Sequence, residues 1–99
     1  MSLDSIHHIA ICVKDISESV EYYSNNFNCE IEYQDNSWAF LKFANTYLAL
    51  VLPDQHPAHI AFPVQDASKF GTPKLHRDGT SSVYHKDPSN NAIEYIQLK

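Results

Sequence analysis

The chain has 99 residues, which is room for one small domain, and its 43% hydrophobic and 19% charged residues are those of an ordinary soluble globular protein. A net charge of −5, with only seven Lys and Arg, argues against nucleic acid or an anionic membrane as a partner, because both need clustered positive charge. No apolar run approaches the length of a membrane span, no secretory signal opens the chain and the two cysteines lack a CxxC spacing, so we expect a protein of the reducing cytoplasm.

The first element expected is a strand over residues 8–13, "HIAICV", in which large and small side chains alternate. The large face consists of Ile9, Ile11 and Val13 and needs a covering helix. The opposite face begins with His8 and continues with small residues, which leave space beside the histidine.

A helix is expected over residues 16–27. Asp15 and Glu18 have the spacing of an N-cap and the third helical residue. The apolar residues on one helical stripe are Ile16, Val20, Tyr23 and Phe27. Three strands follow, with Asp and Asn residues at the turns between them, over residues 29–34, 37–43 and 46–52.

Residues 53–57, "PDQHP", are expected to be a linker, because two prolines and an aspartate cannot continue a central strand. The linker divides a single domain, residues 1–99, into module one, residues 1–52, and module two, residues 58–99. Module two opens with a strand like the first, but "DASKF" allows barely one helical turn before Gly71 and Pro73 stop it. Further strands are expected over residues 74–77, 81–86 and 92–98, the last two joined by the turn "DPSNN".

One pattern, His-Ile-Ala-x-x-Val-x-Asp-x-Ser, occurs twice, and it begins at His8 and at His59. An internal repeat indicates one structural unit used twice. The sequence therefore predicts an α+β fold of two βαβββ modules, the second with a reduced helix. His8 and His59 take equivalent places on the small faces of their strands, whereas His7 faces the opposite way.

Glu94 is a third chemical candidate, since it lies mid-strand among apolar neighbours, where a carboxylate is costly unless it is paired or coordinated. Two neutral imidazoles and one carboxylate on rigid strands bind a divalent metal ion and leave positions open, as an enzyme requires. We therefore interpret His8, His59 and Glu94 as metal ligands. In the competing interpretation, each histidine is an ordinary core or surface residue and Glu94 faces solvent on an edge strand.

The segments "HHIAICVKDISESVEYY", "AHIAFPVQD" and "YHKDPSNNAIEY" resemble the vicinal oxygen chelate superfamily, which includes glyoxalase I, extradiol dioxygenases, fosfomycin-resistance transferases and bleomycin-resistance proteins. The resemblance covers nearly the whole chain. It implies that the two βαβββ modules form a half-open barrel round a metal site, with His8, His59 and Glu94 at the family's metal positions.

The resemblance has departures that bear on chemistry. Members like glyoxalase I carry a further Glu in the last strand of the first module, where this chain has an apolar residue, Ala49, and this favours the three-ligand pattern of extradiol dioxygenases and fosfomycin-resistance enzymes. The segment "HRDGTSSVYHKDPSNNAIE" resembles the extradiol dioxygenase signature but departs from it at Asn90. On this resemblance Tyr84 and His76 are expected to be catalytic, proton-handling groups. The alternative is a surface histidine and a core or pocket-wall tyrosine.

The predicted function is thus a metal-dependent enzyme whose small-molecule substrate chelates the ion through neighbouring oxygens, with dioxygenase-, lyase- or transferase-type chemistry. The cofactor is a divalent metal ion: Fe, Mn, Zn, Ni or Co. The alternative is a metal-free binding or sequestration protein of the bleomycin-resistance type. A homodimer is also expected, because "DASKF" is too short to cover the apolar face of Ile60, Phe62 and Val64.

Overall fold

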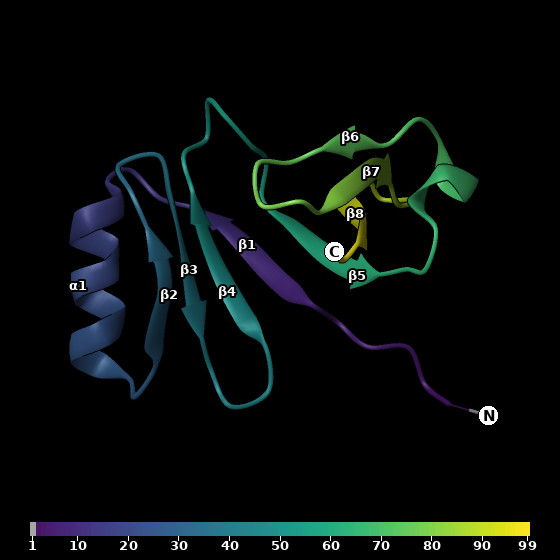
Figure 1. Cartoon of the computed structure of the whole chain (residues 1–99). Coiled ribbons are helices and arrows are strands. Elements are labelled where there is room, and N and C mark those ends of the chain that lie inside the picture. Colours follow the sequence, from purple (N-terminus) through teal and green to yellow (C-terminus); the bar gives the residue numbers. More distant parts are fainter. Residues whose placement is uncertain (1) are drawn as a thin grey trace. The chain divides into compact units, whose positions relative to one another are not determined.

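The computed structural model describes residues 2–99, which divide into two compact units (Figure 1). The first unit is His8–Ala58, and the second consists of residues 2–7 and His59–Lys99. These units, whose bounds differ from those expected from the sequence, are called module one and module two from here on. The residues before the first strand thus group with module two, where the His7 N–H donates to the Ala61 carbonyl oxygen over 2.9 Å. No helix among residues 2–99 has the length and apolar character needed to cross a membrane.

Module one contains one helix and four strands. In chain order these are β1 (His8–Cys12), α1 (Ile16–Asn26), β2 (Glu30–Gln34), β3 (Trp38–Lys42) and β4 (Tyr47–Val51). β1 and β4 are parallel neighbours, and β3 pairs antiparallel with both β4 and β2. A parallel pair needs a crossover connection, and α1 with the β2–β3 hairpin supplies it. Each expected element is present, with bounds within one residue of those predicted.

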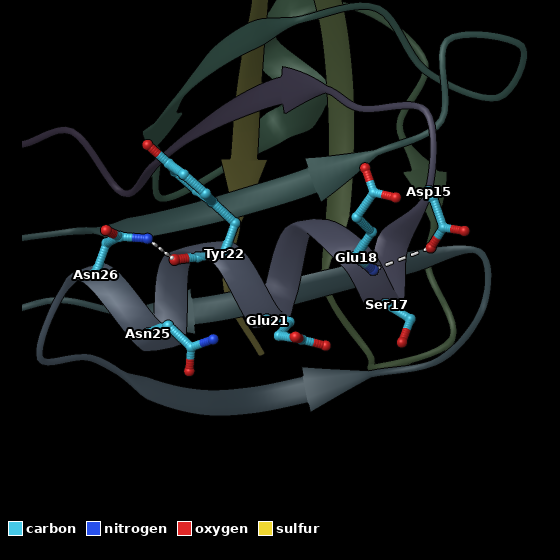
Figure 2. Close-up of a pocket in the computed structure, with 7 residues that line it drawn as sticks. All are labelled: Asp15, Ser17, Glu18, Glu21, Tyr22, Asn25 and Asn26. Atoms are coloured by element: carbon cyan, nitrogen blue, oxygen red, sulfur yellow. Dashed lines mark hydrogen bonds between the residues drawn. The ribbon is translucent and has the colours of Figure 1, made fainter.

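α1 begins where the sequence predicts because Asp15 caps it. The Asp15 side chain accepts a hydrogen bond from the backbone N–H of Glu18 over 3.0 Å (Figure 2). The helix ends when Phe27 adopts an extended backbone, and the Phe27 N–H still donates to the Tyr23 carbonyl oxygen. With this extended backbone Phe27 is 51% exposed. The helix residues that pack in the core therefore end at Tyr23, and the expected apolar stripe does not reach Phe27.

The two faces of the module-one sheet carry different cores. Between α1 and one face of the sheet lie the buried residues Ile16 and Val20 of the helix and Ala39, Leu41 and Leu50 of the strands. The opposite face holds Ala10, Ala49 and Val51, with Trp38 and Phe40 packed against them. Alternation along each strand produces this division. Ile11 and Val13 pack against the α1 core as expected, whereas Ile9 is 38% exposed.

Module two repeats the connectivity of module one. Its elements are β5 (His59–Pro63), the 3₁₀ helix η1 (Ala67–Phe70), β6 (Lys74–Leu75), β7 (Ser81–Lys86) and β8 (Ala92–Gln97). β5 and β8 are parallel, and β7 pairs antiparallel with β8 and β6. A single 3₁₀ turn takes the place of α1. The predicted α+β fold of two βαβββ modules with a reduced second helix is therefore confirmed.

β6 is shorter than expected because the chain turns immediately after it. The His76 N–H donates to the Thr80 carbonyl oxygen over 2.7 Å, and the Gly79 N–H donates to the His76 carbonyl oxygen over 3.1 Å. Gly79 has a φ of 91°, which a residue with a side chain rarely adopts. The strand therefore ends at Leu75, and His76 lies at the start of a tight turn beside β7.

η1 covers only part of one face of module two. Ala67 is fully buried, and the Phe70 ring stacks on Tyr95 with centroids 4.2 Å apart. Phe62 and Val64 are half-buried, but Ile60 remains 36% exposed. The homodimer expected from this face stays a prediction.

Candidate metal centre

Strand pairing in module two puts three of the expected site residues on one face of its sheet. Glu94 on β8 pairs with Ala61 on β5 and with Tyr84 on β7. His59 pairs with Ala92, which lies two residues before Glu94 and hence on the same face. The side chains of His59, Glu94 and Tyr84 therefore project from adjacent strands to one side, and the small Ala61 and Ala92 leave room between them.

His59 and Glu94 form a buried pair. Their side chains are each 4% exposed, and His59 Nε2 lies 3.0 Å from Glu94 Oε1. A carboxylate with so little access to water is stable only when it is hydrogen-bonded, ion-paired or metal-bound. The alternative in which Glu94 faces solvent on an edge strand is wrong, because β8 lies between β5 and β7.

Two hydroxyl groups also donate to Glu94. Ser82 Oγ donates to Glu94 Oε2 over 2.5 Å, and Ser82 itself is 1% exposed. The Tyr84 hydroxyl forms a second hydrogen bond to Glu94, and the Tyr84 ring meets the His59 ring edge-on. Burial above all, then the negative charge of Glu94 and this hydrogen bond, raise the pKa of Tyr84. The phenol therefore stays protonated at neutral pH and acts as a donor.

His76 joins the same cluster from the turn after β6. Its Nε2 lies 2.9 Å from Ser82 Oγ and 3.8 Å from Glu94 Oε2, and its side chain is 25% exposed. A serine hydroxyl has one hydrogen, and that of Ser82 goes to Glu94, so the Ser82 oxygen accepts from the His76 Nε2–H. Sequence reasoning missed Ser82. The available signal was its place two residues before Tyr84 in "SSVYHK", which puts both on one face of β7.

His8, the remaining expected ligand, belongs to module one. It is buried at the start of β1, and its ring meets the Phe40 ring edge-on with centroids 5.4 Å apart. It shares its sheet face with Ala10 and Ala49, which pair across β1 and β4. This is the place that His59 occupies in module two, as the repeat predicts.

The strand registers also identify which residues are equivalent in the two modules. In module one Ala10 pairs with Ala49, and in module two the equivalent Ala61 pairs with Glu94. Ala49 therefore occupies the module-one position that corresponds to Glu94, where members like glyoxalase I were expected to carry a further Glu. Where module two has Glu94, Tyr84 and Ser82, module one has Ala49, Phe40 and Trp38. The positions that carry polar side chains in module two thus carry apolar or aromatic side chains in module one.

Other histidines have separate places. His85 lies on the opposite face of β7 from Tyr84, with its Nε2 2.6 Å from the Phe70 carbonyl oxygen and its ring edge-on to Tyr95. His56 lies in the linker, where its carbonyl oxygen accepts from the Cys12 thiol over 3.4 Å. His85 therefore makes a suitable control for the candidate ligands.

A hollow of about 640 Å³ lies along α1, and none of the candidate ligands lines it (Figure 2). It is lined by Asp15, Ser17, Glu18, Glu21, Tyr22, Asn25 and Asn26. The Asn26 side-chain amide donates to the Tyr22 carbonyl oxygen over 2.7 Å and so stays close to the helix. Three carboxylates on an open helix surface are an ordinary solvated face, and we assign no chemistry to this hollow.

Comparison with known sequences identifies a family for this chain. The family model described as Glyoxalase/Bleomycin resistance protein/Dioxygenase superfamily matches residues 5–65. Among curated proteins the chain is similar to the metallothiol transferase FosB of Lysinibacillus sphaericus, with 28% identity over an alignment of 74 residues, and the match covers 67% of this chain and 52% of that protein. The chain therefore spans about half the length of this curated relative.

Solved structures share the fold. A variant of the methylmalonyl-CoA epimerase of Streptomyces coelicolor, in complex with 2-nitronate-propionyl-CoA, has a TM-score of 0.77 and 20% identity and covers 97% of this chain and 95% of its own. A glyoxalase/bleomycin resistance protein/dioxygenase superfamily member from Vibrio splendidus has a TM-score of 0.73 and 11% identity, and covers 97% of this chain and 100% of its own. At these identities the likeness is one of fold.

Proposed function

Because the chain belongs to the glyoxalase/bleomycin resistance protein/dioxygenase superfamily, we propose that it is a metal-dependent enzyme acting on a small molecule. The divalent ion would be held by His8, His59 and Glu94, and the substrate would chelate it through two neighbouring oxygens. The observation that carries the proposal is the buried pair in module two, with His59 Nε2 3.0 Å from Glu94 Oε1.

The donor set of this pair suits a divalent ion. Imidazole nitrogen and carboxylate oxygen are ligands that Fe, Mn, Zn, Ni and Co all accept. Two such atoms bonded at about 2.1 Å to one ion, and at a right angle, lie about 3.0 Å apart. This is the separation between His59 Nε2 and Glu94 Oε1. The same separation suits a hydrogen bond, so the pair fits both a metal-bound and a metal-free protein.

His8 is proposed as the third ligand on the strength of the repeat. His8 and His59 begin equivalent strands and are each 7% exposed, and all three proposed ligands are buried. The proposal requires the two modules to form the half-open barrel typical of the family, so that the faces carrying His8 and His59 meet. Its support is the shared fold with solved structures over 97% of the chain.

A bound ion would act as a Lewis acid on a substrate carbonyl or enolate oxygen. Tyr84 and His76 are the proposed proton-handling groups beside it. Tyr84, whose pKa is raised, would supply a hydrogen-bond donor and not a base. His76, which is 25% exposed at its side chain, would exchange protons with solvent.

Transfer chemistry is the reaction type with most support, because the curated relative is a metallothiol transferase. Lyase and dioxygenase chemistry remain within the proposal, since the same ligand types serve all three. A cytoplasmic location and a homodimeric assembly belong to the same proposal.

A metal-free binding protein is the second candidate, and one observation favours it. In the part of the chain that the structure describes, no buried side-chain nitrogen or oxygen lacks a hydrogen-bond partner. His59, Ser82 and Tyr84 therefore satisfy Glu94 without an ion. A sequestration protein would use the same cluster to bind its ligand directly.

Metal content decides between the two candidates. The protein is purified without chelators, and its metal is measured by elemental analysis and then by calorimetric titration of the stripped protein with Mn²⁺ or Zn²⁺. We expect one ion per chain, lost in the His8→Ala, His59→Ala and Glu94→Ala variants and retained in His7→Ala and His85→Ala. His85 is the matched control because it lies in the same module on the opposite sheet face. A wild-type chain that binds neither ion would refute the enzyme and leave the binding protein.

A further inference from the structure

Ser82 has no part in the ligand set, yet it is among the most buried polar residues of module two. It is 1% exposed, and its hydroxyl donates to Glu94 Oε2 over 2.5 Å. We propose that Ser82 is a positioning residue that makes Glu94 bind the ion through Oε1 alone. This inference rests on the proposed function, since it concerns how one ligand of that ion is held.

The two oxygens of Glu94 have different partners. Oε1 lies 3.0 Å from the ring nitrogen of His59, the neighbouring proposed ligand. Oε2 accepts the short hydrogen bond from Ser82. A hydroxyl bound to a carboxylate at this length is among the stronger hydrogen bonds in proteins, because the acceptor is charged. Glu94 could turn Oε2 toward an ion only by giving up that bond, and little water reaches its side chain, which is 4% exposed, to replace it.

His76 holds the Ser82 hydroxyl in the required direction. Its Nε2–H donates to Ser82 Oγ over 2.9 Å and so occupies a lone pair of the Ser82 oxygen. The hydroxyl hydrogen of Ser82 is left to donate to Glu94. The order of donation is therefore from His76 to Ser82 to Glu94. Outer hydrogen-bond partners of this kind fix the orientation of metal ligands and sustain metal affinity.

The consequence concerns the space left for substrate. A six-coordinate ion with three single-atom protein ligands keeps three positions open. Two of these would take the neighbouring oxygens of the substrate, and the third would remain for water or a co-substrate. Glu94 bound through both oxygens would close one of the three. Ser82 thus preserves the number of positions that the proposed chemistry uses.

The test compares Ser82→Ala with Ser81→Ala in the full chain. Ser81 is the adjacent residue on β7, and its side chain lies on the opposite face of the sheet. Affinity for Mn²⁺ is measured by titration, and the carboxylate stretching bands of ¹³C-labelled Glu are recorded by infrared difference spectroscopy on adding the ion. These bands distinguish binding by one oxygen from binding by two.

In Ser82→Ala we expect Mn²⁺ affinity to fall about 10–100-fold and the spectrum to change from the one-oxygen to the two-oxygen form. Ser81→Ala should match the wild type in both measurements, and Ser82→Thr, which keeps the hydroxyl, should restore the one-oxygen spectrum. Adding His76→Ala to Ser82→Ala should cause no further loss of affinity, because His76 acts through Ser82.

If Ser82→Ala binds Mn²⁺ as tightly as the wild type with the same spectrum, this inference is overturned and the proposed function stands. Equal losses in Ser81→Ala and Ser82→Ala would also overturn it, since general damage to β7 would then explain them. A wild-type chain that binds no ion would overturn the inference and the proposed function together.

Discussion

The substitution Tyr84→Phe tests the hydrogen-bond network round Glu94 in the metal-free protein. It removes the hydroxyl that donates to Glu94 and keeps the ring, which meets His59 edge-on with centroids 5.6 Å apart. Packing is therefore conserved while one donor to a buried carboxylate is lost. We expect the free energy of unfolding to fall.

The size of the effect follows from the charge and exposure of the groups. A hydrogen bond to a charged group contributes about 1.5–3 kcal/mol. The lower value applies here, because Tyr84 is 38% exposed, so water can replace its hydroxyl, and Ser82 continues to donate to Glu94. A loss of about 1.5 kcal/mol lowers the Tm of a chain of this size by about 6–12 °C.

The assay is urea unfolding in the presence of a chelator, followed by the fluorescence of Trp38, the single tryptophan. The matched control is Tyr95→Phe on β8, whose ring stacks on Phe70 at the opposite sheet face. Its stability should stay within about 0.5 kcal/mol of the wild type. If Tyr84→Phe is as stable as Tyr95→Phe, the hydroxyl does not support Glu94 and the reasoning about the cluster fails.

Three further predictions concern the turn before β8 and the assembly. The pKa of Asp87 is lowered from 3.8, chiefly by the hydrogen bond from the side-chain amide of Asn91, so the carboxylate stabilises the folded protein above about pH 4 and this stabilisation is lost as the pH falls. Asp87→Asn should therefore lower the Tm at pH 7 and flatten the decline of Tm at acid pH. Parallel profiles of Tm against pH in the variant and the wild type would contradict this. Asn90 has a φ of 70°, so Asn90→Ala should cost about 1 kcal/mol in urea unfolding while Asn90→Gly should not, and equal losses would exclude backbone strain. The proposed homodimer should scatter light at twice the chain mass of 11.3 kDa and dissociate in Ile60→Lys, whereas a wild-type mass near 11.3 kDa would show a monomer.

The strands and helices are predictable because local chemistry decides where each one starts and stops. β7 occupies residues 81–86 as expected, since turn residues bracket it at Gly79 and Asp87. β6 was expected to continue to residue 77, but the hydrogen bonds of the turn start at His76 and end it at Leu75. Propensity alone does not reveal which backbone groups such a turn engages.

The cluster round Glu94 was only partly predictable, because it depends on register across three strands. The repeat identifies His59, and the apolar surroundings identify Glu94. The contact of Ser82 with Glu94 can be inferred only when Tyr84 is known to pair with Glu94. In that register Ser82 is a diagonal cross-strand neighbour of Glu94, and its hydroxyl reaches Oε2. His76 comes from a turn, and its place is set by the hydrogen bonds of that turn and not by any strand period.

The two modules have one backbone pattern but different side chains at its chemical positions, and this difference bears directly on the proposed site. The module-one face that carries His8 is aromatic, with Phe40 stacked on Tyr47 at 4.6 Å and Trp38 5.7 Å from Phe40. A glutamate at position 49 would have given the proposed ion a fourth protein ligand and left two open positions instead of three. Ala49 keeps that third position open. Divergence between the repeats thus leaves the proposed ion with three open positions instead of two.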